Sequence, residues 1–468
     1  MPPKYNAILP LAFLSGCSTT TLISEFVPMI DQAALSRSAP GIWKSDGYGY
    51  ILDNAHAPKV YNVVGDFCQL IEVDQESPLI YFDRFRLDRN ERRLFLSSFT
   101  EPHEIGFDRI GDLPDSCLAP AATDALSIFD VFAETYAKHY AFFGTHGVEW
   151  TQATAEARAR LTFDSSEQEL VETFIGLLSQ LKDGHVSISA TVDGDEGQFI
   201  AYPGRTNEAI QRTHSGEGSA MAAFGRQYLR RDIEDAILGG QGIDFPNERI
   251  KYGITGGDIG YMAVMSEGGF ASGKNGKDAS PEEELAALEP ALDQAMAFFN
   301  ENSVQAVIID LSVNSGGYDY LGRAVAARFA KDRTFVYSKF AYDAQNKSPT
   351  RIYIEPSSGE RFVGPVYVLT SDMTVSAGES LAMSLRALPH VTHAGEATRG
   401  SLSDVLVKYL PNGWEITLSN EVYTDHAGDE WEGKGIEPQL PIQVFDPDIP
   451  LTGHVDAVEA LIKAIRTG

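Results

Sequence analysis

The chain has 468 residues, which is too long for one typical domain and predicts two or three. Hydrophobic residues make up 43% of it and aromatic residues 10%, which excludes a globally disordered protein. Acidic residues outnumber basic ones by 66 to 37, for a formal net charge of −29. Such a surface repels phosphate backbones, so we expect no nucleic-acid partner.

The first 16 residues have the features of a secretory signal. A basic start with Lys4 precedes an apolar run over residues 7–14, which is too short to span a bilayer as a mature helix. The run ends in Leu-Ser-Gly-Cys17, which resembles the bacterial lipobox, where the cysteine is acylated. We therefore expect residues 17–39 to form a tether that anchors the protein in the bacterial cell envelope, on the periplasmic side and in the outer membrane. The alternative is an ordinary signal peptide with a cysteine nearby by chance.

Residues 40–121 alternate apolar and polar side chains between Gly, Asp and Asn punctuation, which predicts a small β-rich N-terminal domain. The two cysteines other than Cys17 lie here. In an oxidising compartment Cys68 and Cys117 could form a disulfide, although sequence alone leaves their separation in space open. No Cys/His spacing predicts a zinc site and the HExxH motif is absent, so we expect no metal.

A helical period begins at residue 122 and predicts a helical segment over residues 122–190. Apolar side chains recur three or four positions apart from Leu126 to Tyr140. A later helix starts at Ser166-x-x-Glu169, the pattern of a capping box, and ends at Asp183-Gly184. The Gly-rich residues 191–250 are expected to form a variable region that covers part of the active site.

Strands and helices alternate over residues 251–446, which predicts a layered α/β domain. Continuous apolar runs at residues 306–311 and 365–370 are typical of strands buried on both faces. Amphipathic or capped helices are expected at residues 283–300, 321–330 and 376–388, and a final helix within residues 447–468. The fold class is therefore α/β in the C-terminal domain and multi-domain α+β overall.

Three short segments carry residue types suited to nucleophilic chemistry. Ser376 follows a buried strand and opens a helix, where free backbone N–H groups and the helix dipole favour a developing oxyanion. Gly316 and Gly317 follow another buried strand and allow the backbone to turn sharply beside a ligand. His185 follows a helix end, and the ordinary pKa of a histidine side chain lies near neutrality. Each has a simpler structural explanation by itself: a helix N-cap, a turn and a structural histidine.

In combination and order these segments resemble peptidase family S41, which includes the tail-specific proteases and the tricorn core. Six segments between about Phe129 and Val444 carry the resemblance. They are LKDGH at 181–185, Gly260-Tyr261, DLSVNSGG at 310–317, TVSAGE at 374–379, GEATRG at 395–400 and WEGKGIEP at 431–438. The resemblance implies a ClpP/crotonase-like fold for residues 251–446 and hydrolysis of peptides or unfolded proteins without a metal or organic cofactor.

The resemblance also assigns roles to residues. Ser376 is the implied nucleophile, and N–H groups of Ala377 and of Gly316 or Gly317 form the oxyanion hole. The tail-specific branch uses a lysine base after its GExTxG segment, where this chain has Ser401 and the nearest lysine is Lys408. The tricorn-like branch uses a histidine and a glutamate at the positions of His185 and Glu432. We therefore expect a Ser-His-Glu site acting through an acyl-enzyme.

Two departures from the family pattern bear on this site. The tricorn core has a serine before its histidine, where this chain has Gly184, so Glu432 must reach His185 directly or through water, or another group orients the imidazole. Ser312 also replaces the arginine of the DLRxNxGG segment. Two alternative functions stay open: an esterase using the same site, and a non-catalytic member of the fold that binds ligands.

Overall fold

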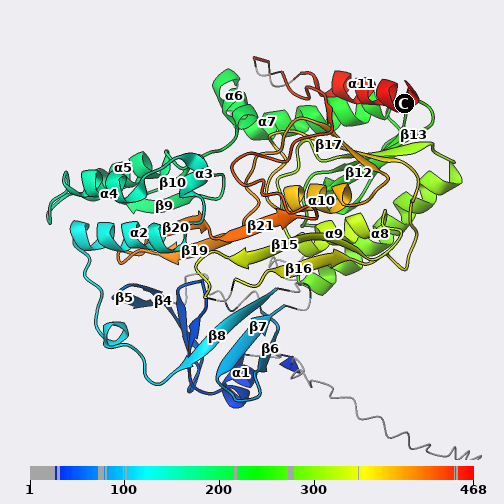
Figure 1. The fold of residues 1–468 in the computed structure, drawn as a ribbon. Coiled ribbons are helices and arrows are strands. Elements are labelled where there is room, and N and C mark those ends of the chain that lie inside the picture. Colours follow the sequence, from blue (N-terminus) through cyan, green and yellow to red (C-terminus); the bar gives the residue numbers. More distant parts are fainter. Residues whose placement is uncertain are drawn as a thin grey trace, which may run out of the picture.

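The computed structural model (Figure 1) describes residues 27–28, 32–71, 79, 82–98, 100, 103–214, 219–271, 279–345, 347–446, 448–449 and 452–467. The predicted signal peptide and Cys17 lie outside these residues. Within the described ranges, no helix combines the length and the apolarity that crossing a membrane requires.

The N-terminal part of the described chain is an eight-stranded antiparallel sheet, in the order β1-β6-β7-β8-β2-β3-β4-β5. Its strands are β1 (Val27–Pro28), β2 (Ile42–Ser45), β3 (Tyr50–Asp53), β4 (Lys59–Val64), β5 (Phe67–Leu70), β6 (Arg84–Leu87), β7 (Arg93–Ser97) and β8 (Glu104–Ile110). Helix α1 (Gln32–Ser38) lies beside it (Figure 1). Alternate side chains such as Trp43, Leu52 and Leu94 are buried, as the sequence period predicts.

A disulfide joins Cys68 on β5 to Cys117 in the short 3-10 helix η2 (Asp115–Leu118), with a Cα–Cα distance of 4.6 Å. The bond bridges a sequence separation of 49 residues. Restricting the unfolded chain over a loop of this length stabilises the folded sheet by about 4 kcal/mol in the chain-entropy model. The bond fastens the segment that leaves the sheet and leads to the helices.

Four helices follow the sheet: α2 (Ala125–His139), α3 (Phe143–His146), α4 (Trp150–Arg158) and α5 (Glu167–Leu178). The predicted apolar face of α2 is buried at Phe129, Phe132 and Tyr136. The ring of Phe132 stacks on Phe174 of α5 with centroids 3.9 Å apart. The Ser166 capping box starts α5 as predicted, so local sequence fixed both the face and the start of these helices.

The C-terminal α/β part is built on a seven-stranded sheet in the order β11-β12-β13-β14-β17-β18-β22, parallel from β13 onward. Its strands are β11 (Ile243–Asp244), β12 (Ile250–Thr255), β13 (Ile259–Val264), β14 (Ala306–Asp310), β17 (Val366–Thr370), β18 (Val391–Gly395) and β22 (Leu440–Pro441). The predicted runs at 306–311 and 365–370 are therefore central strands. The α/β class predicted from the sequence is confirmed.

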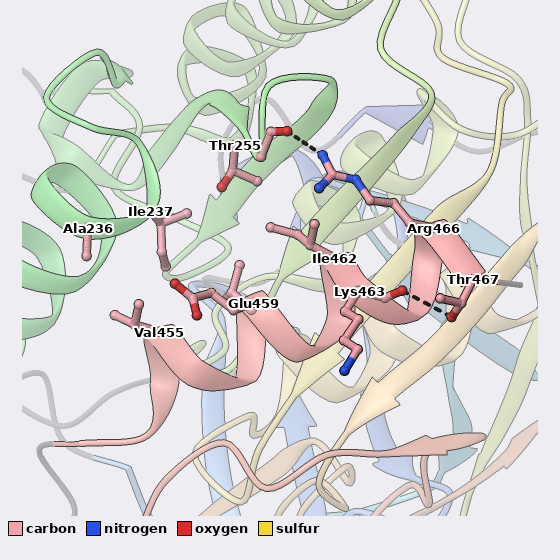
Figure 2. A pocket seen from close by; sticks show the side chains of 11 residues that line it. Ala236, Ile237, Thr255, Val455, Glu459, Ile462, Lys463, Arg466 and Thr467 are labelled. Atoms are coloured by element: carbon pink, nitrogen blue, oxygen red, sulfur yellow. Dashed lines mark hydrogen bonds between the residues drawn. The ribbon is translucent and has the colours of Figure 1, made fainter.

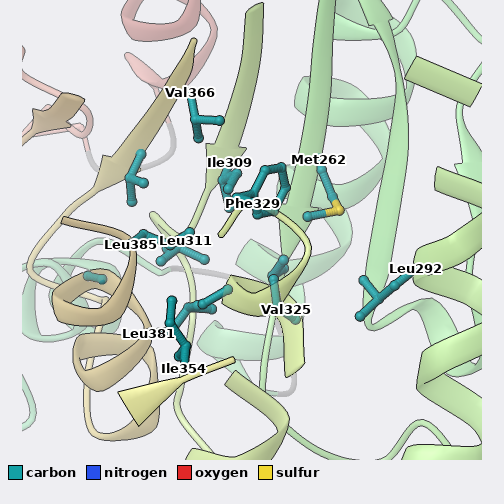
Figure 3. Packing of buried hydrophobic residues seen from close by; sticks show 14 of the residues in the cluster. Met262, Leu292, Ile309, Leu311, Val325, Phe329, Ile354, Val366, Leu381 and Leu385 are labelled. Atoms are coloured by element: carbon teal, nitrogen blue, oxygen red, sulfur yellow. The ribbon is translucent and has the colours of Figure 1, made fainter. Parts of the chain in front are cut away.

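Helices cover both faces of this sheet. On one face, α8 (Pro281–Glu301), α9 (Asp319–Ala327) and α10 (Ala377–Arg386) pack against alternate strand residues such as Ile309, with Leu381 and Phe329 in the same cluster (Figure 3). On the other face, α7 (Ala220–Gln227), the π-helix η3 (Tyr228–Ile237) and α11 (His454–Thr467) cover Ile308. Because both faces are covered, the strands read as continuous apolar runs in the sequence.

Two smaller antiparallel sheets connect these parts. One has the order β10-β9-β20-β19 and the other β16-β15-β21. Their strands are β9 (Ser187–Val192), β10 (Asp195–Ile200), β15 (Thr334–Ala341), β16 (Thr350–Ile354), β19 (Val405–Tyr409), β20 (Glu415–Ser419) and β21 (Glu421–Asp425). Pairing of β9 with β20 places Ser187 opposite Thr417 and so draws the His185 segment to the C-terminal domain.

The region expected to be variable has its own secondary structure. Besides β10 it contains α6 (Arg205–Thr213), α7 and the π-helix η3. Helix α7 and η3 pack on the sheet face that α11 also covers. Thr206 at the start of α6 donates from its N–H to the Asp372 carboxylate at 2.8 Å, close to the turn before Ser376. Much of this region is therefore a packed layer of the α/β domain.

Candidate active site

Ser376 occupies a sharp turn between β17 and α10. Its backbone has φ +59° and ψ −126°, a region that costs a non-glycine residue about 1–3 kcal/mol and persists only where the surroundings impose it. Its N–H donates to the carbonyl oxygen of Ser401 at 3.0 Å. The residue is partly exposed while its neighbours Val375 and Ala377 are buried. The turn therefore presents the Ser376 side chain at the start of a helix, where negative charge is favoured.

The Gly-Gly turn after β14 lies directly against Ser376. A β-carbon added to Gly316 would lie 2.7 Å from the Ser376 β-carbon, so only glycine fits there. The Gly316 N–H already donates to Asn314 Oδ1 at 2.9 Å. Among the described residues, neither the Gly317 N–H nor the Ala377 N–H has an acceptor. Of the two glycines offered by the sequence, Gly317 is thus the one with a free donor to pair with Ala377.

A buried acid supports this Gly-Gly turn. Glu267 is fully buried, and its Oε1 accepts from Asn314 Nδ2 at 2.8 Å, while Asn314 also donates to the Val264 carbonyl at 3.0 Å. Burial raises the pKa of Glu267 to about 8, although the Asn314 hydrogen bond works in the opposite direction. The sequence offered no local signal for this role, because Glu267 follows a strand in an ordinary-looking MSEGG stretch.

Ser401 connects the segment of His185 to the turn that carries Ser376. The N–H of Gly184 donates to Ser401 Oγ at 3.0 Å, while the Ser401 carbonyl accepts from Ser376. A β-carbon on Gly184 would lie 2.8 Å from Ser401 Oγ, which explains why this chain has no side chain before the histidine. In the part of the chain that the structure describes, the His185 ring and the Ser376 hydroxyl share no hydrogen bond, and Nδ1 of the ring is buried without a partner.

The surroundings of His185 favour its neutral form. Burial lowers the pKa of His185, and the Arg399 cation acts in the same direction. The carboxylates of Asp183 and Asp404 and the backbone of Ser403 oppose this shift. Asp183 Oδ1 also accepts from the His185 N–H at 2.8 Å, which fixes the backbone of the histidine.

Glu432 binds the loop beside His185 and makes no ion pair with the imidazole among the described residues. Its Oε2 accepts from the N–H groups of Leu402 at 2.9 Å and Ser403 at 3.0 Å. Its Oε1 is buried without a partner. Burial, followed by repulsion from the Asp183 carboxylate, raises the pKa of Glu432 well above its ordinary value.

Glu379 closes the turn on which all of these contacts depend. Its carboxylate is fully buried and accepts from the N–H groups of Gly400 and Ser401, both at 2.8 Å, and from the Thr398 hydroxyl at 2.5 Å. It also accepts from the Ser376 N–H at 3.3 Å. Glu379 is not among the site residues predicted from the sequence; the Ser376-x-x-Glu379 spacing, which matches a capping box, is the signal that could have indicated its contact with the Ser376 N–H.

The lysine alternative and the missing arginine also have structural explanations. Lys408 donates from Nζ to the carbonyl oxygens of Tyr48 and Gly49, at 2.5 and 2.8 Å, in the N-terminal part of the chain, and burial lowers the pKa of Lys408 well below its ordinary value. Where the family has arginine beside Asp310, this chain has Ser312, and Asp310 instead lies 2.6 Å from Nε2 of the buried His454 on α11. The partner of Asp310 thus comes from a distant helix.

A cavity of about 470 Å³ lies away from these residues, against α11 (Figure 2). Ile237, Val455 and Ile462 form its apolar lining, and Glu459 and Arg466 lie among the polar residues around it. None of the sequence-predicted site residues lines it. Within the described ranges, no group of three or more His, Cys, Asp or Glu side chains is placed to hold a metal ion.

Comparison with known proteins identifies the class. Residues 275–442 match the model of peptidase family S41, a span that includes the Gly-Gly turn, Ser376 and Glu432. Residues 275–442 are therefore a peptidase family S41 region, as the sequence motifs predicted. His185 lies outside the matched residues.

Solved structures share the fold. A candidate peptidase from Parabacteroides merdae is 22% identical, with 74% of this chain and 97% of that chain covered and a TM-score of 0.57. Mature CPAF is 13% identical, with 73% of this chain and 97% of that chain covered and a TM-score of 0.52. At these identities the likeness shows the fold alone.

The turn held by Glu379 can be tested by substitution. We expect Glu379→Gln to lower hydrolytic activity at least about tenfold, and stability by about 1–3 kcal/mol, because the amide cannot accept all the N–H groups that face the carboxylate. Glu169→Gln is the matched control, since Glu169 has the same position in the solvent-exposed capping box of helix α5. Equal effects of the two substitutions, measured by thermal unfolding and by turnover, would contradict this role.

Proposed function

We propose that the protein is a serine peptidase that hydrolyses peptide bonds through an acyl-enzyme. The observation that carries the proposal is the contact of one loop, residues 401–403, with all three candidate residues. Ser401 bonds the backbone of Ser376 and of Gly184 next to His185, and Leu402 and Ser403 bond Glu432. Residues up to 247 positions apart in the sequence therefore share one framework.

In the proposed reaction, Ser376 Oγ attacks the peptide carbonyl carbon while His185 accepts the hydroxyl proton. The N–H groups of Ala377 and Gly317 face the oxyanion and lower the barrier by about 3 kcal/mol per donor. The C–N bond then breaks, and the imidazolium returns the proton to the leaving amine. Water, deprotonated by the same imidazole, hydrolyses the Ser376 ester and frees the hydroxyl.

Glu432 would stabilise the imidazolium. His185 Nδ1 and Glu432 Oε1 are both buried without a partner in the described part of the chain, and both residues lie at the backbone of Ser403. Unpaired buried polar atoms are costly, and a joint hydrogen bond, direct or through water, would satisfy both. Such a pair would form as His185 takes the proton from Ser376.

Covalent labelling tests the nucleophile and the base. A fluorophosphonate probe should modify Ser376, Ser376→Ala should abolish labelling, and His185→Ala should slow it by about 10²-fold or more, since a general base contributes on that scale. His390→Ala, four residues beyond the end of α10, is the control and should label normally. A folded wild-type protein that leaves Ser376 unlabelled would instead favour a ligand-binding role.

If labelling succeeds, a comparison of kcat/KM on unfolded proteins with kcat/KM on simple esters separates a peptidase from an esterase.

The pH dependence follows from the surroundings of His185. Only the neutral imidazole accepts the proton, so kcat/KM should be full above the pKa of His185 and fall as the pH drops through it. Because burial lowers the pKa of His185, the midpoint should lie below the ordinary value of about 6.5. A pH-rate profile between about pH 4 and 10 measures this, and a midpoint above the ordinary histidine value of about 6.5 would contradict the assignment of His185 as the base.

We further propose that acylation of Cys17 anchors the protein in the cell envelope. The lipobox-like Leu-Ser-Gly-Cys17 supports this, and the Cys68–Cys117 disulfide fits an oxidising compartment. The mature protein purified from membranes should begin at a lipid-modified Cys17 by mass spectrometry, and Cys17→Ser should release it from the membrane fraction. An unmodified mature N-terminus elsewhere would contradict the anchor.

A further inference from the structure

Tyr48, in the N-terminal part of the chain between β2 and β3, has a buried hydroxyl that faces the C-terminal domain. The hydroxyl donates to Glu421 Oε1 at 2.5 Å, and it lies 2.8 Å from His103 Nε2. His103 Nδ1 lies 3.1 Å from the Thr350 hydroxyl. Burial lowers the pKa of His103 to about 3, so the ring is neutral. A neutral ring can accept from Thr350 and donate to Tyr48, which fixes the direction in which the Tyr48 proton points.

Glu421 continues this connection toward the active site. It is the first residue of β21, and it is 2% exposed. Its Oε2 lies 3.1 Å from the ammonium of Lys339 on β15, which also contacts Asp404. The Glu421 N–H donates to the Ser403 hydroxyl at 2.9 Å. The carboxylate is thus fixed by Tyr48, Lys339 and His103, while its backbone supports Ser403.

Ser403 ends the connection at the catalytic groups. It is fully buried, its N–H donates to Glu432 Oε2 at 3.0 Å, and its backbone lies beside the His185 ring. The path Tyr48–Glu421–Ser403–Glu432 therefore consists of three successive hydrogen bonds among residues that are at most 6% exposed. In such a dry environment each bond is strong, and an unpaired member is costly.

We propose that Tyr48 is a positioning residue for the peptidase site, so that the N-terminal sheet forms part of the active-site support. The inference rests on the proposed function, because it assigns Tyr48 a role in the reaction of Ser376, His185 and Glu432. Without the Tyr48 hydroxyl, Glu421 Oε1 loses its donor in a buried place and the start of β21 shifts. Ser403 then moves with the start of β21, and the carboxyl group of Glu432 moves with Ser403.

The chain supplies a matched control. Tyr50 lies at the same junction, is equally buried, and donates from its hydroxyl to the Val407 carbonyl at 2.7 Å. Its bond ends on β19 instead of on Ser403. Tyr48→Phe and Tyr50→Phe each delete one buried hydroxyl between the same two parts of the molecule, and their costs in stability should be similar, about 1–3 kcal/mol.

The experiment compares the two variants by steady-state kinetics, fluorophosphonate labelling and thermal unfolding. We expect Tyr48→Phe to reduce kcat about 10- to 100-fold with little change in KM, and Tyr50→Phe to leave kcat within about twofold of wild type. The midpoint of the acidic limb of the pH profile should move down in Tyr48→Phe only, because the Ser403 backbone raises the pKa of His185 and would be displaced. Equal losses in the two variants would show a merely structural role and overturn the inference.

A double-mutant cycle tests the path itself. Ser403→Ala should reproduce the kinetic defect of Tyr48→Phe, and the double variant should be no slower than Ser403→Ala by itself, since both break one path. Additive losses would overturn the connection. The two proposals fail separately: an unlabelled Ser376 in folded wild-type protein rejects the peptidase, whereas normal labelling in both wild type and Tyr48→Phe rejects only the role of Tyr48.

Discussion

The carboxylate of Glu379 bonded to the N–H groups of Gly400 and Ser401 is the interaction on which the candidate site depends. It closes a turn whose next residues bond Ser376, the segment of His185 and Glu432. Hydrogen bonds from backbone N–H groups to a buried carboxylate are stronger than those between neutral groups. A single acid on α10 thus fixes a loop that three distant parts of the chain share.

The site also contains more buried acid than the fold requires. Glu267, Glu379 and Glu432 are all buried, and burial raises the pKa of each. Burying a carboxylate is costly, so these groups persist where they organise backbone N–H groups or side-chain amides. Glu267 orients Asn314 behind the Gly-Gly turn, Glu379 holds the 398–401 turn, and Glu432 binds the loop after it. Perturbed groups gathered in this way are typical of functional sites.

The separate parts of the molecule meet at this loop. Strand β9 carries the His185 segment to β20 of the C-terminal half, and Lys408 on β19 binds the carbonyl oxygens of Tyr48 and Gly49 in the N-terminal half. The N-terminal sheet is therefore joined to the strand that directly follows the 401–404 residues. A β-rich N-terminal part that could pass for a separate binding module is instead in polar contact with the support of the site.

The sequence by itself determined the elements whose signals are local. The apolar runs at 306–311 and 365–370 became central strands, Ser166 capped its helix, and Ser376 opened α10 beside a Gly-Gly turn. These features depend on side-chain periodicity and on backbone sterics within a few residues. The six motif segments in combination and order were also sufficient to predict the family.

Only the tertiary structure decided how these elements meet. Gly184 bonds Ser401 across 217 positions, and Tyr48 bonds Glu421 across 373, and neither separation leaves a trace in local periodicity. The sequence left open how Glu432 would reach His185, and in the structure the Glu432 carboxylate bonds the loop at 402–403. Likewise Gly317, and not Gly316, has the free N–H, because Asn314 occupies the other. Such choices depend on which buried donors find acceptors after the chain is packed, and that pairing is a property of the whole fold.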